Sequence, residues 1–164
     1  MKKIKIMHGF VIGLIVVFAL SFIGNIYLEF FSDFMDPYRE LELYNDFIFG
    51  YYTSFVGVFL SVFTFIGLIY VENGLRITLK NGMFNDKSSH NFIMAGKLFF
   101  VSAILGVAFD IAVFLHSEGQ RILGITVESL SKNFLLIILA FVLYIIADII
   151  KNGNELKLDN DLTI

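Results

Sequence analysis

The chain has little of what a water-soluble domain normally uses. It contains no cysteine, no tryptophan and one proline, Pro37, and charged residues make up 16% of its 164 residues, against about 25% in an average soluble domain. The absence of cysteine excludes disulfides, thiolate catalysis and cysteine-based metal sites. Its net charge of −3 and lack of a basic face argue against direct nucleic-acid binding, which requires cations to neutralise phosphates.

What the sequence has in abundance is apolar residues, which make up 57% of the chain and include 20 phenylalanines. They gather in four long runs, each close to the ~20 residues that cross a hydrocarbon core. Continuous runs without strand-like alternation predict helices rather than a barrel. We therefore expect an all-α membrane protein, a four-transmembrane-helix bundle forming a single membrane domain over 1–164. The expected spans are 6–24, 47–71, 92–115 and 134–150.

Two connecting segments carry further expectations. The start, Met1–Lys5 followed by an apolar run, imitates a secretory signal peptide, but the run is long and no A-x-A site follows it, so we expect an uncleaved first span. The connection 116–133 contains a strand-like run, Arg121–Glu128, and is expected to lie flat on the outer surface. The fourth span, 134–150, is expected to be either short or lengthened at its outer end by Ser131–Asn133.

Basic residues are distributed unevenly between the two sides of the predicted membrane. Nine lie on the side of the two termini and the middle connection, and three lie on the other side. Because Lys and Arg concentrate in cytoplasmic loops, this asymmetry predicts an N-in/C-in membrane protein, with both termini in the cytoplasm. The nine are Lys2, Lys3, Lys5, Arg76, Lys80, Lys87, Lys97, Lys151 and Lys157, and the three are Arg39, Arg121 and Lys132.

Small residues recur on one face of the second expected span. Small side chains let helix backbones approach closely in lipid, so this face predicts packing within the bundle; a solute path lined by Ser and Thr is the alternative. The first span has a sparser series, and the third a similar one that ends at Asp110. The three series are Gly50, Ser54, Gly57, Ser61 and Thr64; Gly9, Gly13 and Gly24; and Ala95, Ser102 and Gly106.

Asp110 is the one acidic residue well inside an expected span. A carboxylate at that depth needs polar partners, and Ser54, Tyr51 and Asn25 are expected at the same outer level. This candidate intramembrane polar site is interpreted as a structural hydrogen bond inside the bundle, or alternatively as a proton or cation site.

A second intramembrane hypothesis concerns two opposite charges near the inner ends of the third and fourth spans. Because these spans run in opposite directions, Lys97 and Asp148 are expected at similar depth and form a candidate inner ion pair. Lys151, three residues after Asp148, is the alternative partner.

No constellation for catalysis is visible. The histidines, His8, His90 and His116, lack metal-ligand spacing, and phosphate-binding, zinc-protease and nucleophile-elbow motifs are absent. We therefore expect no enzyme activity, no metal and no cofactor.

Two stretches give the chain a family resemblance. Leu75–Phe84 has a helix end, a glycine and then a phenylalanine before the next helix, and Ala147–Leu156 leads to a last segment, Asp-Leu-Thr-Ile at 161–164. Together with the four-span layout, these features resemble a bacterial membrane family known as domain of unknown function 2975, although the loop holds fewer arginines here. The resemblance implies a membrane protein without enzyme activity that works with a small helix-turn-helix regulator.

These observations lead to two functional hypotheses. In the first, the chain binds a small cytoplasmic regulator protein through its tail, unless the tail folds back on the bundle. In the second, it is a small transporter or channel subunit that uses Asp110 and the polar helix face, and this requires a homo-oligomer because one protomer encloses little space. The candidate partner-binding residues of the tail are Leu156, Asp161, Leu162, Thr163 and Ile164.

Overall fold

The fold consists of four long helices. The computed structural model describes residues 2–33, 51–116 and 121–162. Each helix is long and apolar enough to cross a membrane, and α6, with 42 residues, is about 63 Å long at 1.5 Å per residue. The all-α expectation with four spans is therefore confirmed. The helices are α1 (Lys2–Phe30), α4 (Tyr51–Asn81), α5 (Asp86–His116) and α6 (Arg121–Leu162).

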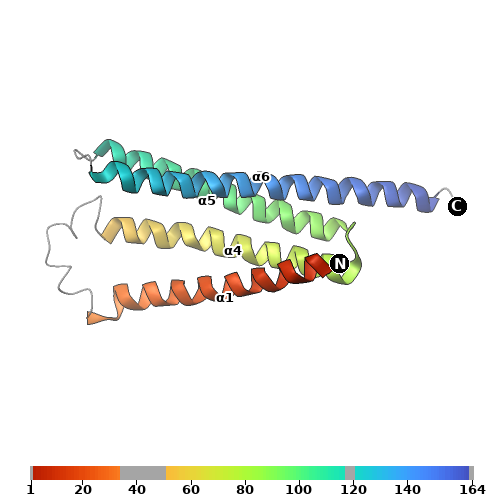
Figure 1. Ribbon diagram of the computed structural model, residues 1–164, viewed down its shortest axis with the longest axis horizontal. Helices are drawn as coiled ribbons and strands as arrows, with labels where there is room; N and C mark the ends of the chain where they lie inside the picture. Colours follow the sequence, from red (N-terminus) through yellow and green to blue (C-terminus); the bar gives the residue numbers. More distant parts are fainter. Residues whose placement is uncertain (1, 34–50, 117–120, 163–164) are drawn as a thin grey trace.

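Both ends of the chain lie at the same end of the bundle, together with the turn between α4 and α5 (Figure 1). We call this the terminal end and the opposite one the loop end. The turn has the expected chemistry: Gly82 has a positive φ of 94°, which glycine adopts without strain, and it ends α4. Asn85 caps α5, since its side-chain oxygen accepts a 3.0 Å hydrogen bond from the amide of Lys87.

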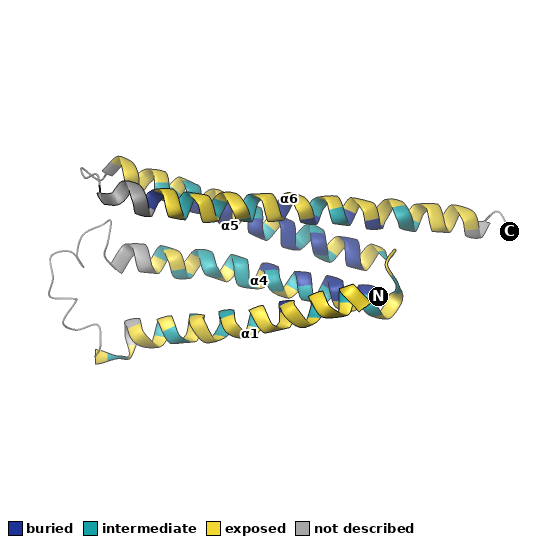
Figure 2. Cartoon of the chain, in the orientation of Figure 1, coloured by how far each residue is buried: buried dark blue, intermediate teal, exposed yellow. Residues whose placement is uncertain are grey.

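The helices pack mainly in chain order, α1 on α4, α4 on α5 and α5 on α6. Burial is uneven along the bundle (Figure 2). Within the described part of α4, the fully buried side chains all lie between Gly67 and Thr78, toward the terminal end. In α1 the only described residue that is fully buried is Val11. The core therefore lies in the terminal half, between α4, α5 and α6.

The α4–α5 contact combines glycines with rings and hydroxyls. The ring of Phe99 packs on Gly67, and a Cβ added to Gly74 would stand 3.0 Å from the ring of Phe92. Two hydroxyl pairs join the same helices, and Ser88 also donates to the carbonyl oxygen of Gly74 at 2.9 Å. Small residues thus bring these two helices close, but the glycines that do so, Gly67 and Gly74, lie beyond the predicted stripe, of which Thr64 takes part through its bond to Ser102. The hydroxyl pairs are Thr64–Ser102 at 3.1 Å and Thr78–Ser88 at 2.6 Å.

The α5–α6 contact follows a repeat of alternating three and four residues along α6. This spacing keeps one face of a helix turned toward its neighbour. Alanines on both helices are fully buried, and Gly96 lies against Tyr144 and the carbonyl of Ala140. The buried or half-buried residues of the α6 repeat are Thr126, Ser129, Asn133, Leu136, Ala140, Leu143, Ala147, Ile150 and Asn154.

Two expectations about the packing and the connections were wrong. Residues 121–130 do not form a strand-like surface segment, because α6 begins at Arg121; the alternative, that Ser131–Asn133 lengthen the fourth helix, is confirmed. The glycines of α1 do not form a packed seam, since a Cβ added at Gly9, Gly13 or Gly24 would meet nothing within 4 Å. Gly57 of α4 is open in the same way, so its part of the stripe makes no close contact.

Candidate functional site

Asp110 is held by α6. Its Oδ1 accepts a 2.8 Å hydrogen bond from the hydroxyl of Ser129, and its Oδ2 accepts a 2.7 Å bond from the side-chain amide of Asn133. Gly106, one turn before Asp110, lies under the Asn133 amide, where a Cβ would stand 2.6 Å from its oxygen. The glycine therefore gives Asn133 the space to reach the carboxylate.

This arrangement connects two helices rather than enclosing a ligand. Both carboxylate oxygens are occupied by donors from the facing helix, which is the satisfied state that buried polar groups require. The expected partners Ser54 and Tyr51 lie in the first turn of α4, and their side chains fall outside what the structure describes. Neither Ser129 nor Asn133 was expected as a partner of Asp110: Ser129 was expected in a surface connection, and Asn133 only as a possible extension of the fourth span. The alternating spacing of Thr126, Ser129 and Asn133 could have indicated that they share one helical face.

The candidate pair of Lys97 and Asp148 is not among the ion pairs of the described residues. Both side chains are exposed. The helix register explains the separation: Gly96 lies against Ala140, and the Ser89 hydroxyl donates to the carbonyl of Ala147 at 2.9 Å. Lys97 is thus level with residues near 140, about two turns or roughly 11 Å deeper than Asp148. That α5 and α6 are antiparallel does not determine how far Lys97 and Asp148 are displaced from each other along the helices.

Lys151, the alternative partner of Asp148, contacts another carboxylate. Its Nζ lies 4.0 Å from Oε1 of Glu155, one turn further along α6. Both side chains are largely exposed, so this pair contributes little to stability.

The tail is helical as far as Leu162. Residues from Lys151 to Leu162 belong to α6, whose C-terminal part extends past the other helices (Figure 1). The α4–α5 turn supports the start of this segment: Phe84 packs on Gly153, and the side-chain amide of Asn154 donates to Asp86 at 3.0 Å.

We call residues 155–162 the α6 extension. Its described side chains, 155–160, are all exposed. Leu156 and Leu158 have 65% and 54% of their surface exposed. Of the other predicted tail residues, Asp161 and Leu162 are part of the helical backbone, whereas Thr163 and Ile164 lie outside the described residues.

A polar contact that sequence analysis did not anticipate joins α1 to α4. The Nε2 atom of His8 lies 3.0 Å from Oε1 of Glu72, and the Arg76 Nε lies 3.7 Å from the same oxygen. Arg76 also donates to the side-chain oxygen of Asn73. His8 and Glu72 are 64 residues apart in the chain, and no local spacing relates them. Within residues 2–33, 51–116 and 121–162, no group of three or more His, Asp or Glu side chains could hold a metal ion.

Comparison of the chain with protein-family models, curated proteins and solved structures finds no match. Its class therefore follows from its own structure. Four packed helices, each long and apolar enough to span a bilayer, leave large apolar side chains exposed along their length, which only a lipid environment accommodates. The chain is a multi-pass integral membrane protein with four spans in contact with the lipid bilayer.

Proposed function

We propose that the chain is a non-enzymatic docking protein, whose α6 extension holds a soluble regulator protein at the membrane surface. One observation carries this proposal: α6 continues about two turns past the α4–α5 turn with Leu156 and Leu158 exposed. Burying each leucine against a partner would contribute about 1.5–3 kcal/mol. Residues two positions apart on a helix do not share a face, so Leu156 and Leu158 present apolar surface on two sides of the extension, and a partner that buries both must wrap around it.

The charges of the extension favour a basic partner. It carries Glu155, Asp159 and Asp161 against a single cation, Lys157. A helix-turn-helix regulator is basic on its DNA-binding surface because it neutralises phosphates. An acidic helix with exposed leucines therefore complements such a protein and could compete with DNA for it.

Two sequence features support the cellular setting of this proposal. The excess of Lys and Arg at the terminal end places the extension in the cytoplasm by the positive-inside rule. The resemblance of residues 75–84 and 147–164 to the domain of unknown function 2975 supports membership of that bacterial family and a regulator as the partner. We accordingly place the protein in the bacterial inner membrane with both termini in the cytoplasm.

The test is co-purification of the tagged full-length chain with the helix-turn-helix protein expected from the adjacent gene. Changing Leu156 and Leu158 together to serine, or deleting residues 157–164, should lower the recovered regulator at least tenfold while membrane insertion stays normal. Asn152→Ala is the matched control, because Asn152 is exposed on the same helix but precedes the extension. Unchanged recovery with both altered chains would reject the docking role, and an adjacent gene of another kind would reject the regulator as partner.

A further inference from the structure

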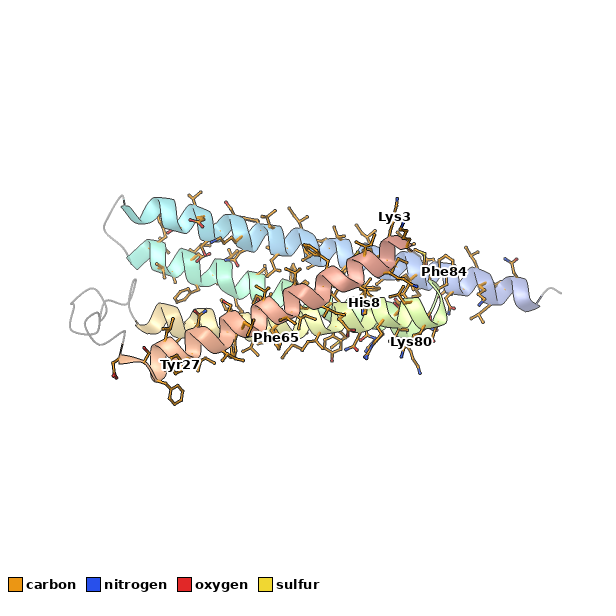
Figure 3. All side chains as sticks on the ribbon, turned by 60° about the horizontal axis from the view of Figure 1, so that its bottom comes forward. Lys3, His8, Tyr27, Phe65, Lys80 and Phe84 are labelled. Atoms are coloured by element: carbon orange, nitrogen blue, oxygen red, sulfur yellow. The ribbon has the colours of Figure 1, made fainter. Side chains whose placement is uncertain are left out.

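Lys97 is an exposed cation within the apolar part of α5. The rings on either side of it along α5 lie against Gly67 and Gly74 of α4, so Lys97 is level with the apolar residues that follow Gly67. Lys80, at the terminal end of the bundle in Figure 3, lies about three turns, or roughly 16 Å, nearer to that end. A charge on a lipid-facing surface at the depth of Lys97 is costly unless another charge compensates it.

Asp148 is the matching exposed charge on α6. Neither Lys97 nor Asp148 forms an ion pair with another residue that the structure describes. Nearby groups have other partners: Lys151, one turn after Asp148, lies 4.0 Å from Glu155, and the Asp86 carboxylate accepts a side-chain amide of α6. Two opposite charges are therefore left uncompensated on neighbouring helices.

An aromatic cluster shows that both charges lie on the same side of the α5–α6 pair. The ring of Phe100 packs edge-on against Phe141, with centroids 6.0 Å apart, and Phe141 packs in the same way on Tyr144 at 6.4 Å. Lys97 lies one turn before Phe100 and Asp148 one turn after Tyr144, so each shares a helix face with its ring. Because α5 begins at the terminal end and α6 runs out past it (Figure 1), both charges lie on the terminal side of the cluster.

The two side chains point toward each other in depth. Helical side chains tilt toward the N-terminus of their helix, so the flexible stem of Lys97 leads toward the terminal end. On the antiparallel α6, Asp148 tilts toward the loop end. Their positions still differ by roughly 11 Å along the bundle, which favours a bridging group over a direct ion pair of about 4 Å.

We propose that Lys97 and Asp148 together bind one zwitterionic phospholipid whose headgroup carries a primary amine, as phosphatidylethanolamine does. The Lys97 ammonium donates to the phosphate, and the lipid amine donates to the Asp148 carboxylate. The order of the charges fits, because the phosphate is attached to the glycerol and lies deeper than the amine, as Lys97 lies deeper than Asp148. His90, exposed two turns before Lys97 on the same face, offers a ring N–H to the same phosphate. The site is independent of the docking function proposed above.

The experiment measures lipid binding to the purified full-length chain by native mass spectrometry, with phosphatidylethanolamine, phosphatidylcholine or phosphatidylglycerol of matched acyl chains added in turn. The complex with phosphatidylethanolamine should be several-fold to roughly tenfold more abundant than either other complex. Choline carries the same charge as the amine but has no N–H to donate, and phosphatidylglycerol has no cation for Asp148. In Asp148→Ala the preference over phosphatidylcholine should disappear, and in Lys97→Gln the complex with phosphatidylethanolamine should fall by a similar factor.

Lys132→Gln and Glu155→Gln are the matched controls, because each removes an exposed charge of α6 away from the site; neither should change the preference. Equal binding of the ethanolamine and choline lipids to the unaltered chain would overturn the proposal, as would a preference that persists in Asp148→Ala. Stronger binding of phosphatidylglycerol would show that Lys97 attracts any anionic lipid without Asp148, and would overturn it too. A dimer that dissociates in Lys97→Gln would show that a second copy of the chain compensates these charges instead.

Discussion

Phe99 of α5 packs its ring directly on Gly67 of α4, and this contact lies in the buried core of the bundle. Phe99 is 1% exposed, and a Cβ on Gly67 would overlap its ring. In lipid, helices associate through close packing rather than through hydrophobic burial. A glycine that admits a phenylalanine ring is therefore a main source of the affinity between these two helices.

Gly67→Ala should destabilise the protein by about 1–3 kcal/mol, because the ring of Phe99 must leave its position to admit the new methyl group. Gly57→Ala is the control on the same helix, since a Cβ there would meet nothing within 4 Å; its effect should stay within about 0.5 kcal/mol. Reversible unfolding in mixed micelles measures both free energies. An equal loss of unfolding free energy in the two variants would show that the packing of Phe99 does not require a glycine at position 67.

Asp110 and Asn133 make a second prediction, which separates a structural role from transport. Asp110→Asn replaces one of the two accepting oxygens with an amide nitrogen, which is itself a donor. That nitrogen faces a donor of Asn133 or Ser129, so one hydrogen bond is lost and the protein should lose about 1–3 kcal/mol of stability. Exchanging the two residues, with Asp110→Asn and Asn133→Asp together, restores one donor and one carboxylate and should recover most of that loss. Unfolding of the single and double variants measures the coupling.

The same Asp110→Asn variant tests the alternative function. If Asp110 only joins α5 to α6, vesicles that contain the original chain should show no proton or cation flux above protein-free vesicles. A flux that depends on the chain and disappears in Asp110→Asn would establish transport. It would also contradict a purely structural assignment of the carboxylate.

The sequence was sufficient to predict four membrane-spanning helices, because the hydropathy that marks a span depends only on the composition of about 20 residues. It offered Ser131–Asn133 as an extension of the fourth span but did not identify the turns of α6 before residue 131, since Lys132 and Asn133 interrupt the apolar run that marks the span. The repeat of Thr126, Ser129 and Asn133 continues through that interruption, and this periodicity was the better indicator of the helix.

Contacts between distant residues were harder to predict than the elements themselves. Lys97 and Asp148 were expected to pair because their helices are antiparallel, but the register that buries Gly96 against Ala140 separates them by two turns. The His8–Glu72 contact depends on how α1 crosses α4, and no spacing along the chain encodes that crossing. Helix direction follows from topology, whereas register follows from side-chain packing.

Ser88 provides a prediction for the polar part of the α4–α5 contact. It is fully buried, donates to the carbonyl of Gly74 at 2.9 Å and pairs with the Thr78 hydroxyl at 2.6 Å. Coupling between side chains in membrane helices averages about 0.6 kcal/mol, so a double-mutant cycle of Ser88→Ala and Thr78→Val should give a value near that. Ser131→Ala, which removes an exposed hydroxyl bonded within α6, should have almost no effect. Zero coupling would mean that the two hydroxyls do not act together.

Gly153 lies where the α4–α5 turn meets α6, just before the α6 extension, and its substitution makes the last prediction. Phe84 packs on Gly153, and Asn154 beside it donates to Asp86. In Gly153→Ala the methyl group should displace the Phe84 ring, separate the α4–α5 turn from α6 and leave the extension less firmly oriented. Spin labels at Met83→Cys and Leu158→Cys, both exposed positions, should then give a broader distance distribution than in the parent chain.

Gly9→Ala serves as the comparison for this last variant, because a Cβ at Gly9 meets nothing within 4 Å; the distribution should remain narrow. Regulator co-purification should fall with Gly153→Ala, since the partner then has to order the helix as it binds, and this ordering reduces affinity. A narrow distribution in Gly153→Ala would show that Phe84 does not orient the extension. A broad distribution with unchanged regulator recovery would show instead that binding does not require a fixed extension.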